Sequence, residues 1–76
     1  MILYQNMSIK QKQLIEYIVQ DLVAMLTERK HYSIQEAMRV VYHSDFHAKL
    51  LDIDTGLYLE GSEYLYQLLC EELEEI

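Results

Sequence analysis

Two histidines, His43 and His47, have the spacing of a metal-binding pair. Residues four positions apart lie on one face of a helix, where two imidazole rings can hold a zinc ion. Ser44 lies between them, and because serine favours the residue before a helix start, a helix break there would separate the rings. Only the fold could bring His31 or Cys70 close enough to complete a site. We therefore predict exposed or hydrogen-bonded histidines, with no metal and no cofactor.

Four acidic residues between positions 52 and 63 have the spacing of a calcium-binding EF-hand loop. The sixth residue of such a loop is glycine, because the chain turns sharply there, but here it is Leu57. The fifth residue, Gly56, offers no side-chain ligand. The sequence therefore favours turns and helix caps over calcium binding for Asp52, Asp54, Glu60 and Glu63.

No residue has the surroundings of a catalytic nucleophile. Cys70, the only cysteine, is followed by Glu71 and Glu72, whose charges disfavour the reactive thiolate. The sequence contains neither a glycine-rich phosphate loop nor a serine nucleophile elbow. A chain of 76 residues also leaves little room for a deep pocket beside a core. We expect that the protein is not an enzyme.

The acidic residues are concentrated in the last third of the chain. The net charge is −7, and residues 1–50 carry six Lys or Arg against five Asp or Glu. Residues 51–76 carry eight acidic residues and no basic one. Such a surface repels nucleic acid and attracts basic proteins at long range. We expect a basic protein partner, the alternative being a solvated face that keeps the protein in solution.

Seven tyrosines are too many for all of them to be internal in a chain of this size. Tyrosine suits surfaces that become dry in a complex, and Tyr64 and Tyr66 lie on either side of Leu65, which helical spacing places inward. At least one of the two should face outward among the acids. The alternative is that the tyrosines only border the core. The predicted partner-binding residues are Tyr58, Glu60, Glu63, Tyr64, Tyr66, Glu71, Glu72, Glu74 and Glu75.

A long first helix must support these residues. A capping-box pattern at Ser8 and Gln11 predicts its start, and His31 marks its end. Leu14, Tyr17 and Met25 should widen its apolar stripe, so that it needs at least two packing partners from the chain or from a second copy. The stripe has helical periodicity through Ile15, Ile18, Val19, Leu22, Val23 and Leu26.

A second capping box, at Ser33 and Glu36, predicts a helix that ends near Tyr42. Residues 34, 37, 38 and 41 should form its inward side. The chain then either breaks at Ser44 and restarts as a short helix over 46–51, or continues as a single helix over 34–51. Both alternatives remain open at the level of sequence.

The two glycines punctuate a loop over residues 52–61, and its apolar segment, residues 57–59, should fold back onto the core. Ser62 should cap a last helix that ends among the glutamates.

These patterns predict one all-α domain over residues 1–76, with residues 1–7 frayed. We expect a bundle of three main helices, with the short helix as an optional addition. Small domains gain stability from disulfides, metals or a partner subunit, and one cysteine cannot pair within the chain, so we expect a homodimer. The lone cysteine and the absence of a leader or membrane-length apolar stretch favour a cytoplasmic protein with no membrane contact.

Three segments resemble a group of short uncharacterised all-helical bacterial proteins with a TGLY-type loop. They are residues 15–19 (IEYIV), 33–42 (SIQEAMRVVY) and 55–69 (TGLYLEGSEYLYQLL), and the resemblance covers about residues 13–73. Some members are encoded beside candidate toxins. The resemblance therefore implies an antitoxin-like or accessory role, most concretely neutralisation of a nucleic-acid-directed toxin, and it supplies no catalytic or ligand residues.

Two other functions remain as alternatives. One is a small DNA-binding regulator, for which four scattered cations on an acidic chain offer little support: Arg29, Lys30, Arg39 and Lys49. The other is a metal-binding protein that uses His43 and His47.

Overall fold

The computed structural model describes residues 7–74, and this part of the chain is all-α, as the sequence predicts. Its helices are α2 (Ile9–Lys30), α3 (Ile34–Tyr42), α4 (Asp45–Leu51) and α5 (Ser62–Glu74). Two 3-10 turns, η1 (Ile53–Thr55) and η2 (Leu57–Leu59), connect α4 to α5. Of the segment expected to fray, residues 1–6 lie outside the described part, and Met7 packs against the core.

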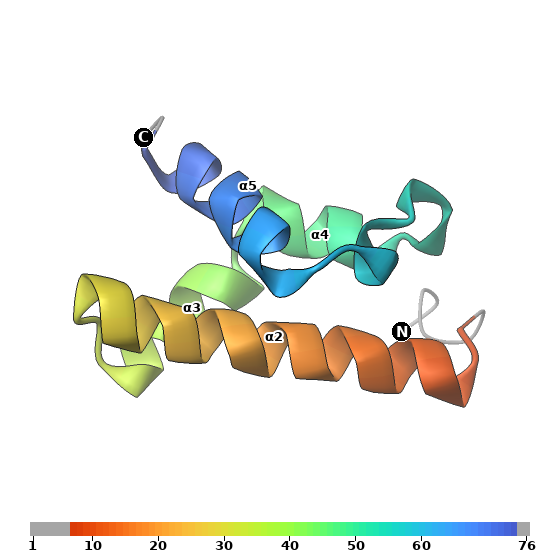
Figure 1. Cartoon of the computed structure of the whole chain (residues 1–76), viewed down its shortest axis with the longest axis horizontal. Coiled ribbons are helices and arrows are strands. Elements are labelled where there is room, and N and C mark those ends of the chain that lie inside the picture. The colour runs from red at the N-terminus through yellow and green to blue at the C-terminus, as the bar shows by residue number, and fades with distance from the viewer. Residues whose placement is uncertain (1–6, 75–76) are drawn as a thin grey trace.

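The helices form two layers (Figure 1). α2 has 22 residues and runs the length of the molecule, while α4 and α5 lie together on one side of it. α3 returns along the second half of α2 and leads into α4. Among residues 7–74, no helix combines the length and the hydropathy that a bilayer crossing requires.

Capping boxes set the starts of α2 and α3. The Ser8 hydroxyl accepts a hydrogen bond from the Gln11 N–H, and the Gln11 side chain accepts one from the Ser8 N–H. Ser33 and Glu36 exchange the same two bonds. Each box satisfies two backbone donors that a helix start would otherwise leave unpaired. Both predicted starts are therefore confirmed.

The chain breaks between α3 and α4, so residues 34–51 form two helices. The Ser44 hydroxyl accepts a hydrogen bond from the His47 N–H at 3.0 Å, which caps α4. α4 begins at Asp45, one residue before the predicted start. The break between α2 and α3 begins at His31, whose left-handed φ of 61° ends α2.

The apolar stripe of α2 is the centre of the core. Contacts from α3, α5 and η2 cover it, which confirms that the stripe needs more than one packing partner. Its six buried members are Ile15, Ile18, Val19, Leu22, Met25 and Leu26. The other helices add Ala37, Val41, Phe46, Leu50, Leu65 and Leu69 to the same cluster.

Some apolar side chains of α2 and η2 that were expected to pack are exposed instead. Leu14 and Tyr17, predicted to widen the stripe, are 43% and 66% exposed because the later elements cover only the side centred on Leu22. Leu59 is 70% exposed, although Leu57 and Tyr58 beside it do pack against the core. Successive side chains of a 3-10 turn point in different directions, so η2 cannot bury all three of its side chains against the core.

Ser62 is not the cap of α5 but its first residue. Its hydroxyl donates a hydrogen bond to the Asp21 carboxylate at 2.8 Å, which ties the start of α5 to the middle of α2. The predicted cap was wrong because α5 begins one residue earlier than expected, with the Gly61 carbonyl oxygen accepting from the Leu65 N–H.

Replacing Leu26 by alanine should lower the free energy of unfolding by about 2–5 kcal/mol, because the fully buried side chain leaves a cavity. That loss is a large part of the roughly 5–15 kcal/mol of a typical domain. Urea unfolding followed by circular dichroism measures it. Leu59→Ala, an exposed control, should change the value by less than about 0.5 kcal/mol. Equal losses in the two variants would contradict the core described above.

Candidate interaction surfaces

An open hollow of about 620 Å³ lies where the last turn of α2 meets α5. Residues three and four apart on α5 share one face, so several acidic and tyrosine side chains reach it together. Five of them belong to the predicted partner-binding set: Glu63, Tyr64, Tyr66, Glu71 and Glu74. Lys30, Gln67 and Cys70 complete the lining. We call this surface the acidic hollow.

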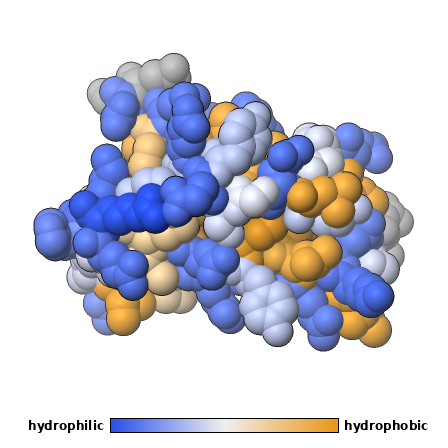
Figure 2. Space-filling model, viewed as in Figure 1, coloured by the Kyte–Doolittle hydropathy of each residue, from blue (hydrophilic) through white to orange (hydrophobic). Residues whose placement is uncertain are grey.

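The acidic hollow has an excess of negative charge. Three carboxylates and one ammonium group line it, and the guanidinium of Arg29 pairs with one of these carboxylates at its edge, so the formal local balance is −1. The ammonium group of Lys30 lies 3.8 Å from Glu74, but the two side chains are 35% and 71% exposed, so water and salt weaken their attraction. Figure 2 shows hydrophilic residues over the end of the molecule where α5 and the last turns of α2 lie, and larger hydrophobic patches toward the other end.

Arg29 orders one edge of the acidic hollow. Its guanidinium donates two hydrogen bonds to Glu63, at 3.1 and 2.5 Å, and its central carbon lies 5.1 Å from the ring centroid of Tyr66. The first contact lowers the pKa of Glu63 and the second is a cation–π contact. Burial and a hydrogen bond with Cys70 raise the pKa of Tyr66 to about 12, so its phenol stays protonated.

Glu72 lies apart from the acidic hollow. Its two carboxylate oxygens accept hydrogen bonds from the backbone N–H groups of Asp45 and Phe46, each at 2.8 Å. These donors are at the start of α4, where the helix dipole also favours a negative charge. Glu72 therefore holds α4 against α5.

The remaining predicted partner residues are also outside the acidic hollow. The Tyr58 hydroxyl accepts a hydrogen bond from the Gln11 side chain at 3.0 Å, which fastens η2 to the start of α2. Glu60 is exposed in the turn before α5, and Glu75 lies outside the described residues.

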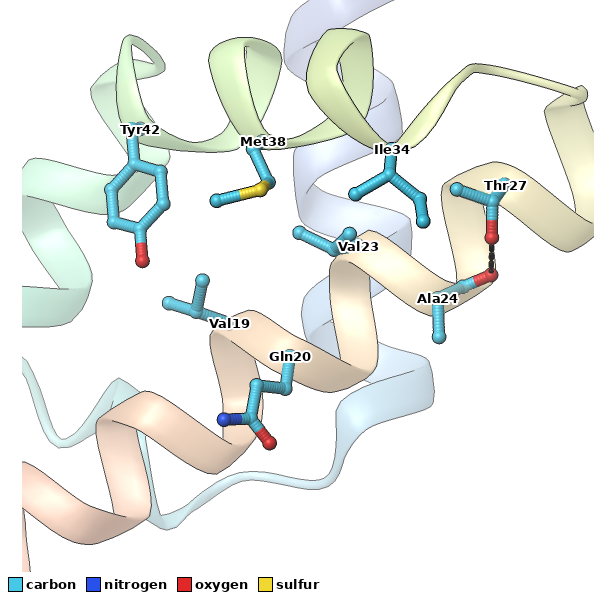
Figure 3. Close-up of a pocket in the computed structure, with 8 residues that line it drawn as sticks. All are labelled: Val19, Gln20, Val23, Ala24, Thr27, Ile34, Met38 and Tyr42. Atoms are coloured by element: carbon cyan, nitrogen blue, oxygen red, sulfur yellow. Dashed lines mark hydrogen bonds between the residues drawn. The ribbon is translucent and has the colours of Figure 1, made fainter.

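A second surface, which the sequence patterns did not predict, is an apolar groove of about 320 Å³ between α2 and α3 (Figure 3). Ile34 and Met38, predicted to point inward, are 64% and 44% exposed along its edge. α3 rests on α2 through Ala37 and Val41, so the row at 34, 38 and 42 faces sideways. The spacing of these three apolar residues, four positions apart, was the signal in the sequence that could have revealed the groove. The lining is Val19, Gln20, Val23, Ala24, Thr27, Ile34, Met38 and Tyr42.

The two candidate metal histidines lie on either side of the helix break. His43 Nδ1 donates a hydrogen bond to the Arg39 carbonyl oxygen at 2.9 Å. The rings of His47 and Tyr42 form a T-shaped pair, with 5.1 Å between ring centroids, and burial lowers the pKa of His47. Within residues 7–74, no three or more His, Cys, Asp or Glu side chains come together as metal ligands would.

Two of the four acids in the calcium-like pattern, Asp52 and Glu63, make other contacts. The Asp52 side chain accepts a hydrogen bond from the Asp54 N–H at 3.1 Å and so caps η1. Glu63, the last acid of the pattern, pairs with Arg29.

Two of the four cations that a DNA-binding role would use are paired within the chain. Arg29 binds Glu63 and Lys30 lies near Glu74, so the cations at the end of α2 have carboxylates beside them. Arg39 and Lys49 are exposed on separate helices, α3 and α4.

The chain was compared with protein-family models, curated proteins and solved structures, and no model, protein or structure matches it. The resemblance to short bacterial proteins therefore stays a prediction. The acidic hollow and the apolar groove are defined by geometry and charge.

Replacing Glu72 by alanine should lower the free energy of unfolding by about 1–2 kcal/mol, because two N–H groups at the start of α4 lose their acceptor. Urea unfolding measures the change. Glu71→Ala removes the same charge from an exposed position of the same helix and should stay within about 0.5 kcal/mol of the wild type. A Glu72 variant as stable as the Glu71 variant would show that this contact does not hold α4.

Proposed function

We propose that the chain is a non-enzymatic protein-interaction module whose acidic hollow binds a basic segment of a partner protein. The observation that carries this proposal is the meeting of three carboxylates and two tyrosine rings on one side of α5. Carboxylates accept charge-assisted hydrogen bonds from Lys and Arg, and tyrosine rings accept cations on their faces.

The order already present in the acidic hollow favours binding. Arg29 holds Glu63 and Tyr66 in place before any partner arrives, so fewer side chains lose freedom on association. The contact of Arg29 with Glu63 and Tyr66 is an example, within the chain, of one guanidinium that binds a carboxylate and a tyrosine ring together. Tyr64, which is 49% exposed, and Glu71 remain accessible for a second cation.

An antitoxin-like role is the most concrete form of this proposal. A protein that acts on nucleic acid presents basic groups to phosphates, and an acidic surface can occupy the same groups. The resemblance to short bacterial proteins encoded beside candidate toxins points the same way. An accessory protein that binds another basic partner would use the same surface.

We also propose that α2, α3 and α5 act as a three-helix bundle with α4 as its short addition, and that two copies associate. A 76-residue chain has a small core, and such domains commonly gain stability by oligomerisation. The apolar groove leaves hydrophobic side chains of α3 in contact with water.

A fluorescein-labelled amphipathic helical peptide of leucine and arginine is a suitable probe. Wild-type protein should bind it, and Glu71→Gln with Glu74→Gln should weaken binding at least about tenfold, because two carboxylates leave the hollow. Fluorescence anisotropy gives the dissociation constant, which should rise with salt concentration.

The matched control is Glu16→Gln with Glu28→Gln, which removes two exposed charges from α2. Its dissociation constant should stay within about twofold of the wild-type value. Equal weakening in both double variants, or no binding by the wild type, would contradict the proposed site.

A further inference from the structure

We propose that the acidic hollow selects arginine over lysine in the basic segment that it binds, and that Tyr64 supplies this preference. The preference rests on the proposed function, because it names which basic residue the same surface recognises. A hollow without the preference would still bind basic segments, so the two proposals fail separately.

The chain's own cations at the hollow differ in how they contact carboxylates. Arg29 and Lys30 are neighbours in the last turn of α2, and both reach acidic residues of α5. The Arg29 guanidinium donates a hydrogen bond to each carboxylate oxygen of Glu63. The Lys30 ammonium stays 3.8 Å from Glu74, which is longer than a hydrogen bond. Because the two cationic side chains are 46% and 35% exposed, water reaches both, and the guanidinium nevertheless makes the closer contact.

A tyrosine ring adds to the contact that the guanidinium makes. The central carbon of Arg29 lies 5.1 Å from the ring centroid of Tyr66, while its N–H groups bind Glu63. A planar guanidinium can bind a carboxylate through its N–H groups and lie over a ring with its face at the same time. An ammonium group is a compact and more strongly hydrated charge, so it gains less from the same two groups. A carboxylate near a tyrosine ring therefore favours arginine.

Tyr64 and Glu71 offer a second carboxylate and ring to a partner. They are seven residues apart, about two helical turns, and so share one side of α5. Gln67 lies between them, and its amide donates a hydrogen bond to the Glu71 carboxylate at 3.4 Å, which directs that carboxylate along α5 toward Tyr64. The Tyr64 side chain is 49% exposed, and within residues 7–74 no Lys or Arg pairs with Glu71. An arginine of the partner therefore finds both groups accessible on the same side of the helix.

Two fluorescein-labelled peptides test the preference. One is the amphipathic helical peptide of leucine and arginine, and the other has lysine in place of every arginine. Fluorescence anisotropy with the wild type should give a dissociation constant at least about threefold lower for the arginine peptide, because each exposed cation–π contact changes affinity a few-fold. Tyr64→Leu should bring the two dissociation constants within about 1.5-fold of each other, mainly by weakening the arginine peptide.

Two control variants separate the ring of Tyr64 from other effects. Tyr64→Phe keeps an aromatic ring at this position and should keep the preference. Tyr17→Leu removes a tyrosine ring that is 66% exposed on α2, outside the hollow, and should also keep it. Because Tyr64 is on the surface and leucine favours helices, Tyr64→Leu should keep the wild-type circular dichroism spectrum.

Equal dissociation constants of the wild type for the two peptides would overturn the preference and leave the proposed function standing. A preference that survives Tyr64→Leu, or that Tyr17→Leu removes equally, would overturn the role of Tyr64. Failure of the wild type to bind either peptide would overturn the proposed function and the preference with it.

Discussion

Burial of one side of α2 is the constraint on which the rest of the structure depends. Leu22 and Leu26 are fully buried, and the cluster around them draws side chains from α3, α4 and α5. Because hydrophobic burial is the main favourable term in folding, the shorter helices are held chiefly by this shared surface. Among residues 7–74, no element covers the side of α3 that carries Ile34 and Met38. The core and the exposed apolar groove therefore have the same origin, a wide apolar surface with few elements to enclose it.

The charges are arranged around that core in two ways. Glu72 is used inside the fold, where it satisfies two N–H groups at the start of α4, and Glu63 is held by Arg29. Glu71 and Glu74 remain at the acidic hollow, where they can attract a basic partner. An acidic surface on α5 and an uncharged surface between α2 and α3 are thus kept apart on one small domain. This separation is the physical basis of the proposed interaction role, since each surface favours a different kind of contact.

Local patterns predicted much of the fold, and long-range contacts decided what the sequence could not. Ser8 with Gln11 and Ser33 with Glu36 are three residues apart, so each capping box could be recognised from sequence alone. The orientation of α3 depends on how closely Ala37 approaches α2, and hence the exposure of Ile34 and Met38 could not be predicted. The contacts of Glu72 with α4, of Ser62 with Asp21 and of Tyr58 with Gln11 span 26 to 47 residues. The sequence showed that the acids are grouped near the end of the chain. It did not show which of them lie at the acidic hollow and which make contacts that hold the fold together.

Native-state amide hydrogen exchange tests the central role of α2 most directly. If the buried side of α2 holds the fold together, the amides of Leu22 and Leu26 should exchange only through global unfolding, with a free energy equal to that measured by denaturant. Amides near the exposed start of α2 should exchange through smaller openings. Exchange at Leu22 and Leu26 as fast as in a fraying helix end, while α5 stays protected, would contradict this account.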